Sequence, residues 1–496
     1  MEYGINPITA MDFPDPDVIR VDDTYYMIST TMHFFPGGQI LRSYDLINWE
    51  VCAYLYDSLE HTAGERLEGE ENVYGHGMWA ASLRYHDGKF YAVFIAHEWD
   101  KTFLFTADRI DGVWEKHYIE GIYHDPSLLF DDDGRVYIVY GNRNIRLTEL
   151  NSELSAPKPG GLDRIIVRDA PGGHLGYEGA HIYKINGKYV LFLIHSKQWK
   201  WYRTQACFVT DDLEGVWAGG DVMEADLDGL GSGPAQGGVV DTPDGKWYSI
   251  VFQDRGAVGR TPVLVPITWN EQGYPKFGEV TKEICCESTR PGTSVEPLYA
   301  SDDFSGSEFK KVWQFNHEPR HGCYKLGGGC YEITTDKLSP TVEYARNTLT
   351  QRTMLPGCAA EVTVGADGLN DGDTAGLCLL IGTYGLIGIT RENGKYFLVM
   401  RSCDTGKGGE TERARLPFEQ TQVRFRAEVK FSGADGTVDF FYKSGEKWEK
   451  LGLTHKMYFT LDHFVGCRFG LFMYSTKNIG GTAKFAGFEY LPDNNE

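Results

Sequence analysis

Apolar and polar positions alternate in a pattern that recurs five times in the first 300 residues of the chain. Each copy has a short opening, an apolar strand, a tight turn and a return strand rich in aromatic residues. The copies read DPDVIRVDDTYYMIST, WAASLRYHDGKFYAVFIA, DPSLLFDDDGRVYIVYG, EGAHIYKINGKYVLFLI and QGGVVDTPDGKWYSIVF, and they begin at Asp15, Trp79, Asp125, Glu178 and Gln236. A two-stranded hairpin repeated at a period of about 50 residues is typical of a β-propeller. The pattern therefore predicts five blades arranged around one axis.

After about residue 297 the repeat ends, and the strands that follow are separated by Gly, Asp and Asn turns at regular spacing. They read YEITTD, CAAEVTVGAD, AGLCLLIGTYGLIGITREN, KYFLVMRS, TQVRFRAEVKFSG, TVDFFYKSG, RFGLFMYST and GTAKFAGFEYL. Many short strands with this spacing are typical of a β-sandwich. We therefore expect an all-β protein with a propeller domain at 1–297 and a sandwich domain at 298–496.

Composition narrows the class of ligand. The 496 residues carry a formal net charge of −22, which repels nucleic-acid phosphates and anionic membrane surfaces. Hydrophobic residues make up 42% of the chain, as in soluble globular proteins, and no apolar stretch approaches the length that spans a bilayer. Aromatic residues make up 14% and include 29 Tyr, whose flat rings are surfaces on which sugars stack. A neutral or cationic ligand is therefore favoured over nucleic acid or a membrane.

The N-terminus and the cysteines bear on location and metal binding. The opening MEYGINPITAMDFPDPD has no basic segment followed by an apolar core, which predicts a cytoplasmic protein, with a trimmed leader as the alternative. The ten Cys are scattered, without a CxxC pair or a Cys/His pair at zinc spacing. We expect reduced thiols and no metal site built from them.

Three of the five openings are carboxylic acids that should face the same central space. Asp15 and Asp125 are each followed by proline, and small residues follow Glu178. Hydrolysis of a glycosidic bond needs one carboxylate to activate water and one protonated carboxylic acid to release the leaving oxygen. A third carboxylate near the acid can raise the pKa of that acid by like-charge repulsion.

The alternative is that these acids only form turns at strand entry. Openings that served structure alone should carry similar residues in all five copies, and Trp79 and Gln236 break that expectation. The pattern therefore favours a catalytic trio.

The motifs around these residues resemble those of glycoside hydrolase family 43, the five-bladed β-xylosidases and α-L-arabinofuranosidases. They are NPI, FPDPDVIRV, FFPGGQILRSYDLINWE, GMWAASLRYHDGKFY, HDPSLLFDDDG, YEGAHIYKINGKY and FQDRGAVGRTPVLVPITW, in the order of the family. Residues from about 300 to 490 are similar to the concanavalin-like β-sandwich at the C-terminus of the xylosidase-type members. The resemblance implies that Asp15 is the general base, that Asp125 modulates pKa and orients, and that Glu178 is the general acid.

The resemblance also implies residues that bind the sugar. Trp79 matches an aromatic wall of the pocket, and Arg260 matches an arginine that contacts sugar hydroxyls and the catalytic carboxylates. Phe34 and Phe35 match aromatic residues at the pocket border. Burial in the core is the alternative for the three aromatic residues, and a surface salt bridge is the alternative for Arg260.

The chain departs from the family pattern at Gln236. Many members have a histidine there that holds a calcium ion or a water cluster on the propeller axis. Glutamine can bind a sugar hydroxyl and can ligate calcium through its carbonyl, but it is the weaker calcium ligand. We therefore expect Gln236 to bind substrate and no cofactor to be required, with calcium left open. Met32 also replaces an aromatic residue that is frequent in the xylosidase relatives.

We therefore predict an exo-acting glycoside hydrolase that inverts the anomeric configuration. Its substrate is a small oligosaccharide from xylan or arabinan, from which it releases terminal β-D-xylose or α-L-arabinofuranose. Two alternatives stay open, a retaining glycosidase on the same fold and a carbohydrate-binding propeller without catalysis. The sequence does not rank the two sugars, and it leaves a homo-oligomer open.

Overall fold

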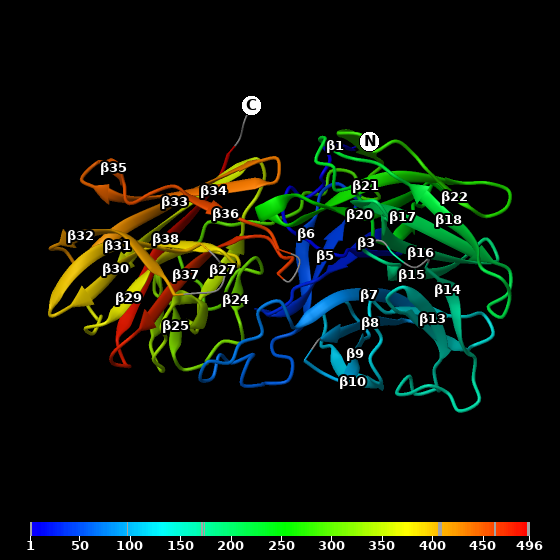
Figure 1. Cartoon of the computed structure of the whole chain (residues 1–496), viewed down its shortest axis with the longest axis horizontal. Helices are drawn as coiled ribbons and strands as arrows, with labels where there is room; N and C mark the ends of the chain where they lie inside the picture. Colours follow the sequence, from blue (N-terminus) through cyan, green and yellow to red (C-terminus); the bar gives the residue numbers. More distant parts are fainter. Residues whose placement is uncertain are drawn as a thin grey trace.

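The computed structural model describes residues 2–96, 98–169, 172, 174–404, 409–460 and 463–493. The prediction of an all-β fold is confirmed, because the only helical elements within these residues are two short 3₁₀ turns, η1 (Gly256–Val258) and η2 (Val342–Tyr344). Figure 1 shows two groups of strands side by side, the first from blue to green and the second from yellow-green to red. No helix in the described part of the chain has the length and apolar content needed to cross a membrane.

The first group forms five four-stranded antiparallel sheets, which are the blades of a propeller. The first blade contains β2 (Asp17–Val21), β3 (Thr24–Ser29), β5 (Gly37–Ser43) and β6 (Glu50–Tyr56). The second contains β7 (Met78–His86), β8 (Lys89–Ala96), β9 (Lys101–Ala107) and β10 (Glu115–Glu120), and the third contains β11 (Ser127–Phe130), β12 (Val136–Tyr140), β13 (Asn144–Glu149) and β14 (Asp163–Arg168). The fourth contains β15 (Glu178–Ile185), β16 (Lys188–Lys197), β17 (Lys200–Thr210) and β18 (Ala218–Met223), and the fifth contains β19 (Val239–Asp241), β20 (Trp247–Asp254), β21 (Arg260–Trp269) and β22 (Pro275–Phe277).

The turns within the blades follow from their sequences. Asp87-Gly88 and Asn186-Gly187 have positive φ at both residues, which the tightest hairpins require and which these residue types tolerate. The first strands of the blades contact one another, β2 with β7 and β19, and β11 with β7 and β15. The five openings seen in the sequence therefore lie around the propeller axis. A separate ribbon pairs β1 (Glu2–Ile5) with β23 (Glu283–Cys286).

Three blades are joined on the axis by Asp17, which is fully buried. Its carboxylate accepts hydrogen bonds from Arg84 Nη1 at 2.7 Å and from the Leu83 amide at 2.8 Å, and it lies 3.1 Å from His181 Nδ1. Burial raises the pKa of Asp17, but the charges of Arg84 and His181 outweigh burial and hold the pKa below its ordinary value. The ionised Asp17 therefore stabilises the closed ring of blades.

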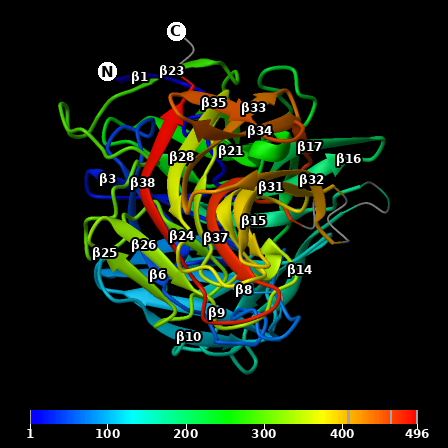
Figure 2. The same cartoon turned by 90° about the vertical axis from the view of Figure 1, so that its left-hand side faces the viewer.

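The second group of strands forms a sandwich of two sheets (Figure 2). The first sandwich sheet has the order β32 (Thr411–Phe418), β31 (Lys395–Cys403), β30 (Tyr384–Glu392), β29 (Asp373–Leu380), β37 (Arg468–Ser475), β27 (Leu349–Arg352), β24 (Gln314–Asn316) and β4 (Phe34–Phe35). The second has the order β25 (Tyr324–Gly327), β26 (Cys330–Thr334), β38 (Thr482–Pro492), β28 (Gly357–Gly365), β33 (Gln422–Ser432), β34 (Asp435–Ser444) and β35 (Lys447–Lys450), and β36 (His455–Met457) pairs with β34. Buried residues alternate with more exposed ones along β33 and β34, as expected for strands with one face in the core.

One strand of the first sandwich sheet comes from the propeller half of the chain. In β4, Phe34 pairs with Asn316 and Phe35 pairs with Phe315 of β24. The expected boundary at residue 297 falls between the last propeller strands and β24, but the sheet itself crosses it. The two domains therefore share a hydrogen-bonded sheet.

Buried polar groups reinforce this junction. Arg352 Nε donates to the Asp12 carbonyl at 2.7 Å, and both Arg352 and Arg468 donate to Gln314 Oε1, at 3.1 and 2.8 Å. The Arg468 guanidinium also lies 3.4 Å from the centre of the Phe34 ring. These contacts fix the sandwich against the strand that leads into the first blade.

The close approach of the domains at Gly256 can be tested by mutation. Gly256 has a φ of +64°, and a Cβ added there would lie 1.9 Å from the carbonyl oxygen of Ala434 in the sandwich. Gly245 is a matched control, because its φ is +81° and a Cβ there would meet nothing within 4 Å. We expect Gly245→Ala to cost about 1 kcal/mol of stability through its backbone alone, and Gly256→Ala to cost a further 1–3 kcal/mol or so through overpacking.

Thermal unfolding of the two variants measures the difference. Equal decreases in melting temperature for Gly256→Ala and Gly245→Ala would contradict a tight contact between the domains.

Candidate active site

A cavity of about 150 Å³ lies where the blade openings converge. Its wall is formed by Asp15, Trp79, Ala80, His124, Asp125, Leu175, Glu178, Trp201, Arg203, Gln236, Arg260 and Phe464. The five residues that begin the sequence repeats are all among them, because equivalent positions of the blades face one axis. The sandwich contributes Phe464.

The backbone turns in the same way at several openings. Asp15, Asp125 and Gln236 have φ values of 50°, 47° and 58°, and Gly179, next to Glu178, has a φ of 64°. A positive φ is unfavourable for residues other than glycine and is concentrated at functional sites. This shared conformation directs side chains from successive blades into one cavity.

Asp15 is buried and bonded on both oxygens. Its Oδ1 accepts a hydrogen bond from Arg260 Nη1 at 2.7 Å, and its Oδ2 accepts one from Thr30 Oγ1 at 2.6 Å. The contact with Arg260 is a charge-assisted hydrogen bond between two side chains that are less than a tenth exposed. Asp15 is therefore held as a carboxylate in a fixed orientation.

Arg260 is fixed from several directions. Its Nε donates to Asp254 at 3.2 Å, and Asp254 also accepts from Arg203 Nε at 2.6 Å. The guanidinium lies between the rings of Phe252 and Phe464, 4.5 and 4.0 Å from their centres. Arg260 is therefore a buried residue of the cavity wall, and the alternative of a surface salt bridge is wrong.

Glu178 and Asp125 form a second acidic group around His124. His124 Nε2 lies 3.4 Å from Glu178 Oε2 and 3.7 Å from Asp125 Oδ1, and Asn142 Nδ2 donates to Glu178. Asp125 also accepts from the Gly179 amide at 3.0 Å. The charges of Asp125 and Glu178 raise the pKa of His124 to about 9, so the imidazole is protonated at neutral pH.

The two carboxyl groups differ in pKa in the opposite sense to the sequence-based prediction. Burial and the negative charges of Glu178 and Asp15 raise the pKa of Asp125 to about 6. Burial also raises the pKa of Glu178, but His124, Arg203 and Arg260 outweigh burial and lower the pKa below its ordinary value. The sequence predicts that Asp125 raises the pKa of Glu178. In the structure Asp125 has the raised pKa and Glu178 the lowered one, because His124, which the sequence did not single out as a partner, bonds to Glu178.

Of the predicted substrate-binding residues, some line the cavity and others do not. Trp79 lines the cavity, donates from Nε1 to the Gly75 carbonyl at 3.0 Å and meets the Phe464 ring edge-on at 5.0 Å. Gln236 also lines the cavity, and its backbone amide donates a hydrogen bond to Gln205 Oε1 at 2.8 Å. The expectation that Phe34 and Phe35 border the cavity is corrected, because neither is in its wall. Both are 2% exposed, since β4 belongs to the sandwich sheet.

Other residues of the site were missed by the sequence reasoning. Arg203 is 2% exposed and begins the buried part of strand β17, which runs from Arg203 to Thr210. A charged residue next to the apolar segment ACFV is a signal that could have been used. Phe464 has no comparable signal, because only the packing of the domains brings it to the cavity.

The site contains one group that could hold a metal ion. Within the described residues, only His124, Asp125 and Glu178 have ligand atoms gathered this closely, all within 4.8 Å of one another. The same three side chains are also close enough to exchange protons with one another.

Comparisons with known proteins identify the family of the chain. The model of Glycosyl hydrolases family 43 matches residues 5–275, and the model of the Beta xylosidase C-terminal Concanavalin A-like domain matches residues 301–491. The chain belongs to glycosyl hydrolase family 43. This family-43 protein is therefore a glycoside hydrolase.

Relatives match over most of the chain. A "Beta-xylosidase" of Formosa agariphila is 26% identical, over 98% of this chain and 90% of its own. A "Non-reducing end alpha-L-arabinofuranosidase" of Bacteroides ovatus is 25% identical over 65% of this chain and 62% of its own. A solved "Bifunctional GH43-CE" protein of Bacteroides eggerthii is 36% identical with a TM-score of 0.90, and the match covers 100% of this family-43 chain and 64% of that one.

The charge of His124 gives a prediction that depends on pH. Its raised pKa means that protonation favours the folded state. This stabilisation is complete below the ordinary pKa of 6.5 and is lost as the pH rises through about 9. Asp125→Asn removes the largest cause of the shift, so we expect it to lower the pKa of His124 by one unit or more, roughly.

Exchange of the imidazole C2 hydrogen, followed by mass spectrometry, measures the pKa of individual histidines. His117 is a control, because its side chain is half exposed and Asp125 is not among its ion-pair partners. An unchanged pKa of His124 in Asp125→Asn would contradict the electrostatic coupling.

Proposed function

We propose that this family-43 hydrolase is exo-acting and releases terminal β-D-xylose or α-L-arabinofuranose from oligosaccharides of xylan or arabinan. The observation that carries the proposal is the small, three-carboxylate cavity of about 150 Å³, closed on one side by Phe464 of the sandwich. A cavity of this size that is bounded on one side by a second domain favours one terminal sugar over the middle of a chain. The names of the relatives, a β-xylosidase and an α-L-arabinofuranosidase, support the two sugars.

We propose Asp15 as the general base. Its charge-assisted hydrogen bond with Arg260 and its hydrogen bond with Thr30 orient the carboxylate. In the reaction, Asp15 takes a proton from water while the water oxygen forms a bond to the anomeric carbon. This single displacement inverts the configuration at that carbon.

Glu178 is the proposed general acid and supplies a proton to the leaving oxygen as the glycosidic bond breaks. A sugar whose glycosidic oxygen displaces His124 from Glu178 removes a contact that lowers the pKa of Glu178. The neighbouring Asp125 then favours the protonated form of Glu178 by like-charge repulsion. Asp125 thereby modulates the pKa of Glu178, and binding of the substrate sets the protonation state of Glu178.

The roles of Asp15 and Glu178 can be separated with two substrates. Asp15→Asn removes the base, so we expect kcat/KM to fall by about 10³-fold or more on both xylobiose and 2,4-dinitrophenyl xyloside. Glu178→Gln removes the proton donor, so we expect a loss of about 10²–10⁴-fold on xylobiose and less than about tenfold on the activated aryl glycoside. Similar losses on both substrates in both variants would refute the assignment.

The product anomer tests the mechanism independently of the residues. Proton NMR of β-xyloside hydrolysis should show α-xylose before mutarotation. If β-xylose forms first, the retaining alternative is correct, and Asp15 is not the base of a single displacement.

Arg260 is proposed to act on the transition state. Lysine keeps the positive charge but cannot hold Asp15 and Asp254 together with a planar fork of donors. We expect Arg260→Lys to lower kcat by on the order of 100-fold, with a smaller effect on KM. An unchanged kcat with a raised KM would make Arg260 a ground-state contact only.

A further inference from the structure

A second and larger cavity lies at the junction of the two domains. Its volume is about 540 Å³, more than three times the 150 Å³ of the catalytic cavity, and the two share no lining residue. Asn72 and Tyr74 of the propeller line one side, and Thr341, Glu343 and Gly382 of the sandwich line the other. A volume in this range is typical of sites for small organic ligands.

Several polar atoms in the wall of this cavity are buried without a hydrogen bond. They are both ring nitrogens of His33, Oδ1 of Asn316 and Oγ1 of Thr341, in residues that are 1%, 1% and 8% exposed. The Asn316 side chain lies next to the His33 ring, but without the geometry of a hydrogen bond. Leaving such a group unpaired costs about 1–3 kcal/mol, so a cluster of them indicates a place for ligand hydroxyl groups.

Most polar groups of the wall are uncharged at neutral pH. Burial and the nearby His317, His463 and Arg468 lower the pKa of His33 well below its ordinary value, so its imidazole offers one donor and one acceptor. Burial and Glu410 raise the pKa of Glu343 to about 7. An imidazole, an amide and a hydroxyl are the groups that bind sugar hydroxyls, and no cation in this set would recognise an anion.

Aromatic surface accompanies these groups. Tyr74, Tyr344 and His463 line the cavity, and the rings of Tyr74 and His463 are inclined by only 26°. The Tyr74 hydroxyl is fixed, because it donates to the Glu343 carbonyl at 2.7 Å and accepts from Asn316 Nδ2 at 2.6 Å. Aromatic rings held in place can pack against the apolar faces of sugar rings.

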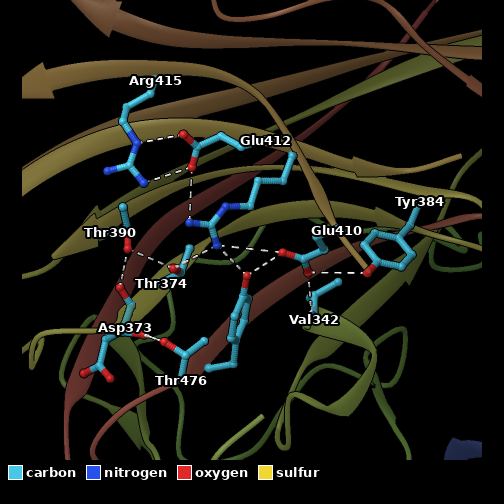
Figure 3. Close-up of polar contacts among 12 residues, drawn as sticks. Val342, Asp373, Thr374, Tyr384, Thr390, Glu410, Glu412, Arg415 and Thr476 are labelled. Carbon is cyan, nitrogen blue, oxygen red and sulfur yellow. Dashed lines mark hydrogen bonds and ion pairs between the residues drawn. The ribbon is translucent and has the colours of Figure 1, made fainter. Parts of the chain in front are cut away.

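The sandwich side of the wall is held by a buried network, shown in Figure 3. Glu410 accepts hydrogen bonds from the Val342 amide at 2.7 Å, from the Tyr474 hydroxyl at 2.6 Å and from the Tyr384 hydroxyl at 3.4 Å. Val342 lies between the cavity residues Thr341 and Glu343. The network therefore fixes this segment in the absence of any ligand, which lowers the cost of binding.

We propose that this cavity is a second saccharide site, which binds a neutral oligosaccharide of two or more sugar units apart from the catalytic cavity. Its pentose class rests on the proposed function. Phe34 connects the two cavities, because it lines the second one and packs against Phe464 and Trp79 of the first. A chain held in the second site would keep further substrate ends close to the catalytic cavity.

The experiment counts saccharide sites by isothermal titration calorimetry. Xylotriose, arabinotriose and maltotriose are titrated into the full-length Glu178→Gln protein, which does not consume them. We expect two sites per chain for at least one pentose trisaccharide, and weaker binding of maltotriose at the second site. One site per chain for both pentose trisaccharides overturns the proposal, and equal affinity for maltotriose overturns the pentose class.

Gly382→Phe, added to Glu178→Gln, fills the second cavity. A Cβ at Gly382 meets only Thr460 Oγ1, at 4.0 Å, so the larger side chain can enter the cavity without a backbone clash. Gly220→Phe in the outer strand β18 is the matched control, because a Cβ there meets nothing within 4 Å. We expect Gly382→Phe to remove the second site and Gly220→Phe to keep it. Retention of both sites in Gly382→Phe overturns the assignment to this cavity.

Thr341→Val keeps the shape of the side chain and removes a hydroxyl that lies next to Tyr384 without the geometry of a hydrogen bond. Its stability should therefore be unchanged or increased, and its affinity for the second saccharide should fall about tenfold. With Glu178 intact, Gly382→Phe and Thr341→Val should hydrolyse nitrophenyl pentosides at the wild-type rate. If the chain without cavity substitutions hydrolyses pentosides but its Glu178→Gln form binds only one saccharide, the proposed function stands and this inference is refuted.

Discussion

The ion pair between Arg260 and Asp15 is the interaction on which the rest of the active site depends. Three acidic side chains converge on a buried space, and their mutual repulsion has to be offset by fixed positive charge. Arg260 supplies that charge from the fifth blade to a carboxylate of the first. Its backbone amide also donates to Asp12 Oδ1 at 2.8 Å, and its guanidinium is covered by Phe464 of the sandwich. Two blades and both domains therefore meet at one guanidinium group.

The same junction explains why the sandwich is part of the catalytic unit. Asp12 lies three residues before Asp15 and is 2% exposed. Burial raises the pKa of Asp12 to about 6 despite the nearby Arg352 and Arg468. Arg468 is itself buried, and burial together with Arg352 lowers its pKa well below the ordinary range. Charged groups are rarely enclosed in this way unless they position something. Here they hold the segment that carries Asp15 against the sandwich.

On the other side of the cavity, the pKa values of Asp125 and Glu178 depend on His124, a cation that can give up its proton. His124 lies between Asp125 and Glu178, and its charge decides which of the two carboxyl groups is protonated. The arrangement gives the cavity one carboxylate fixed by arginine and one acidic pair controlled by histidine. That asymmetry is what a reaction with separate base and acid requires. In the proposed reaction the sugar also takes part in setting the protonation state of Glu178, because it competes with His124 for Glu178 Oε2.

The sequence by itself determined the propeller, because five copies of a hairpin with suitable turn residues can bury their apolar faces only against one another. It also determined the convergence of Asp15, Asp125 and Glu178, because equivalent positions of repeated blades face one axis.

Tertiary structure decided what no repeat encodes. The partners of Arg260, Asp15 and Asp254, lie in different blades or strands, and Phe464 comes from the other domain. Phe34 and Phe35 were misplaced for the same reason, since a two-residue strand pairs with β24 more than 270 residues away. The order of the two pKa values also depended on a contact of His124 with Glu178 across 54 residues of chain. Local pattern specifies which groups face the axis, whereas long-range packing specifies the charges and surfaces that surround them.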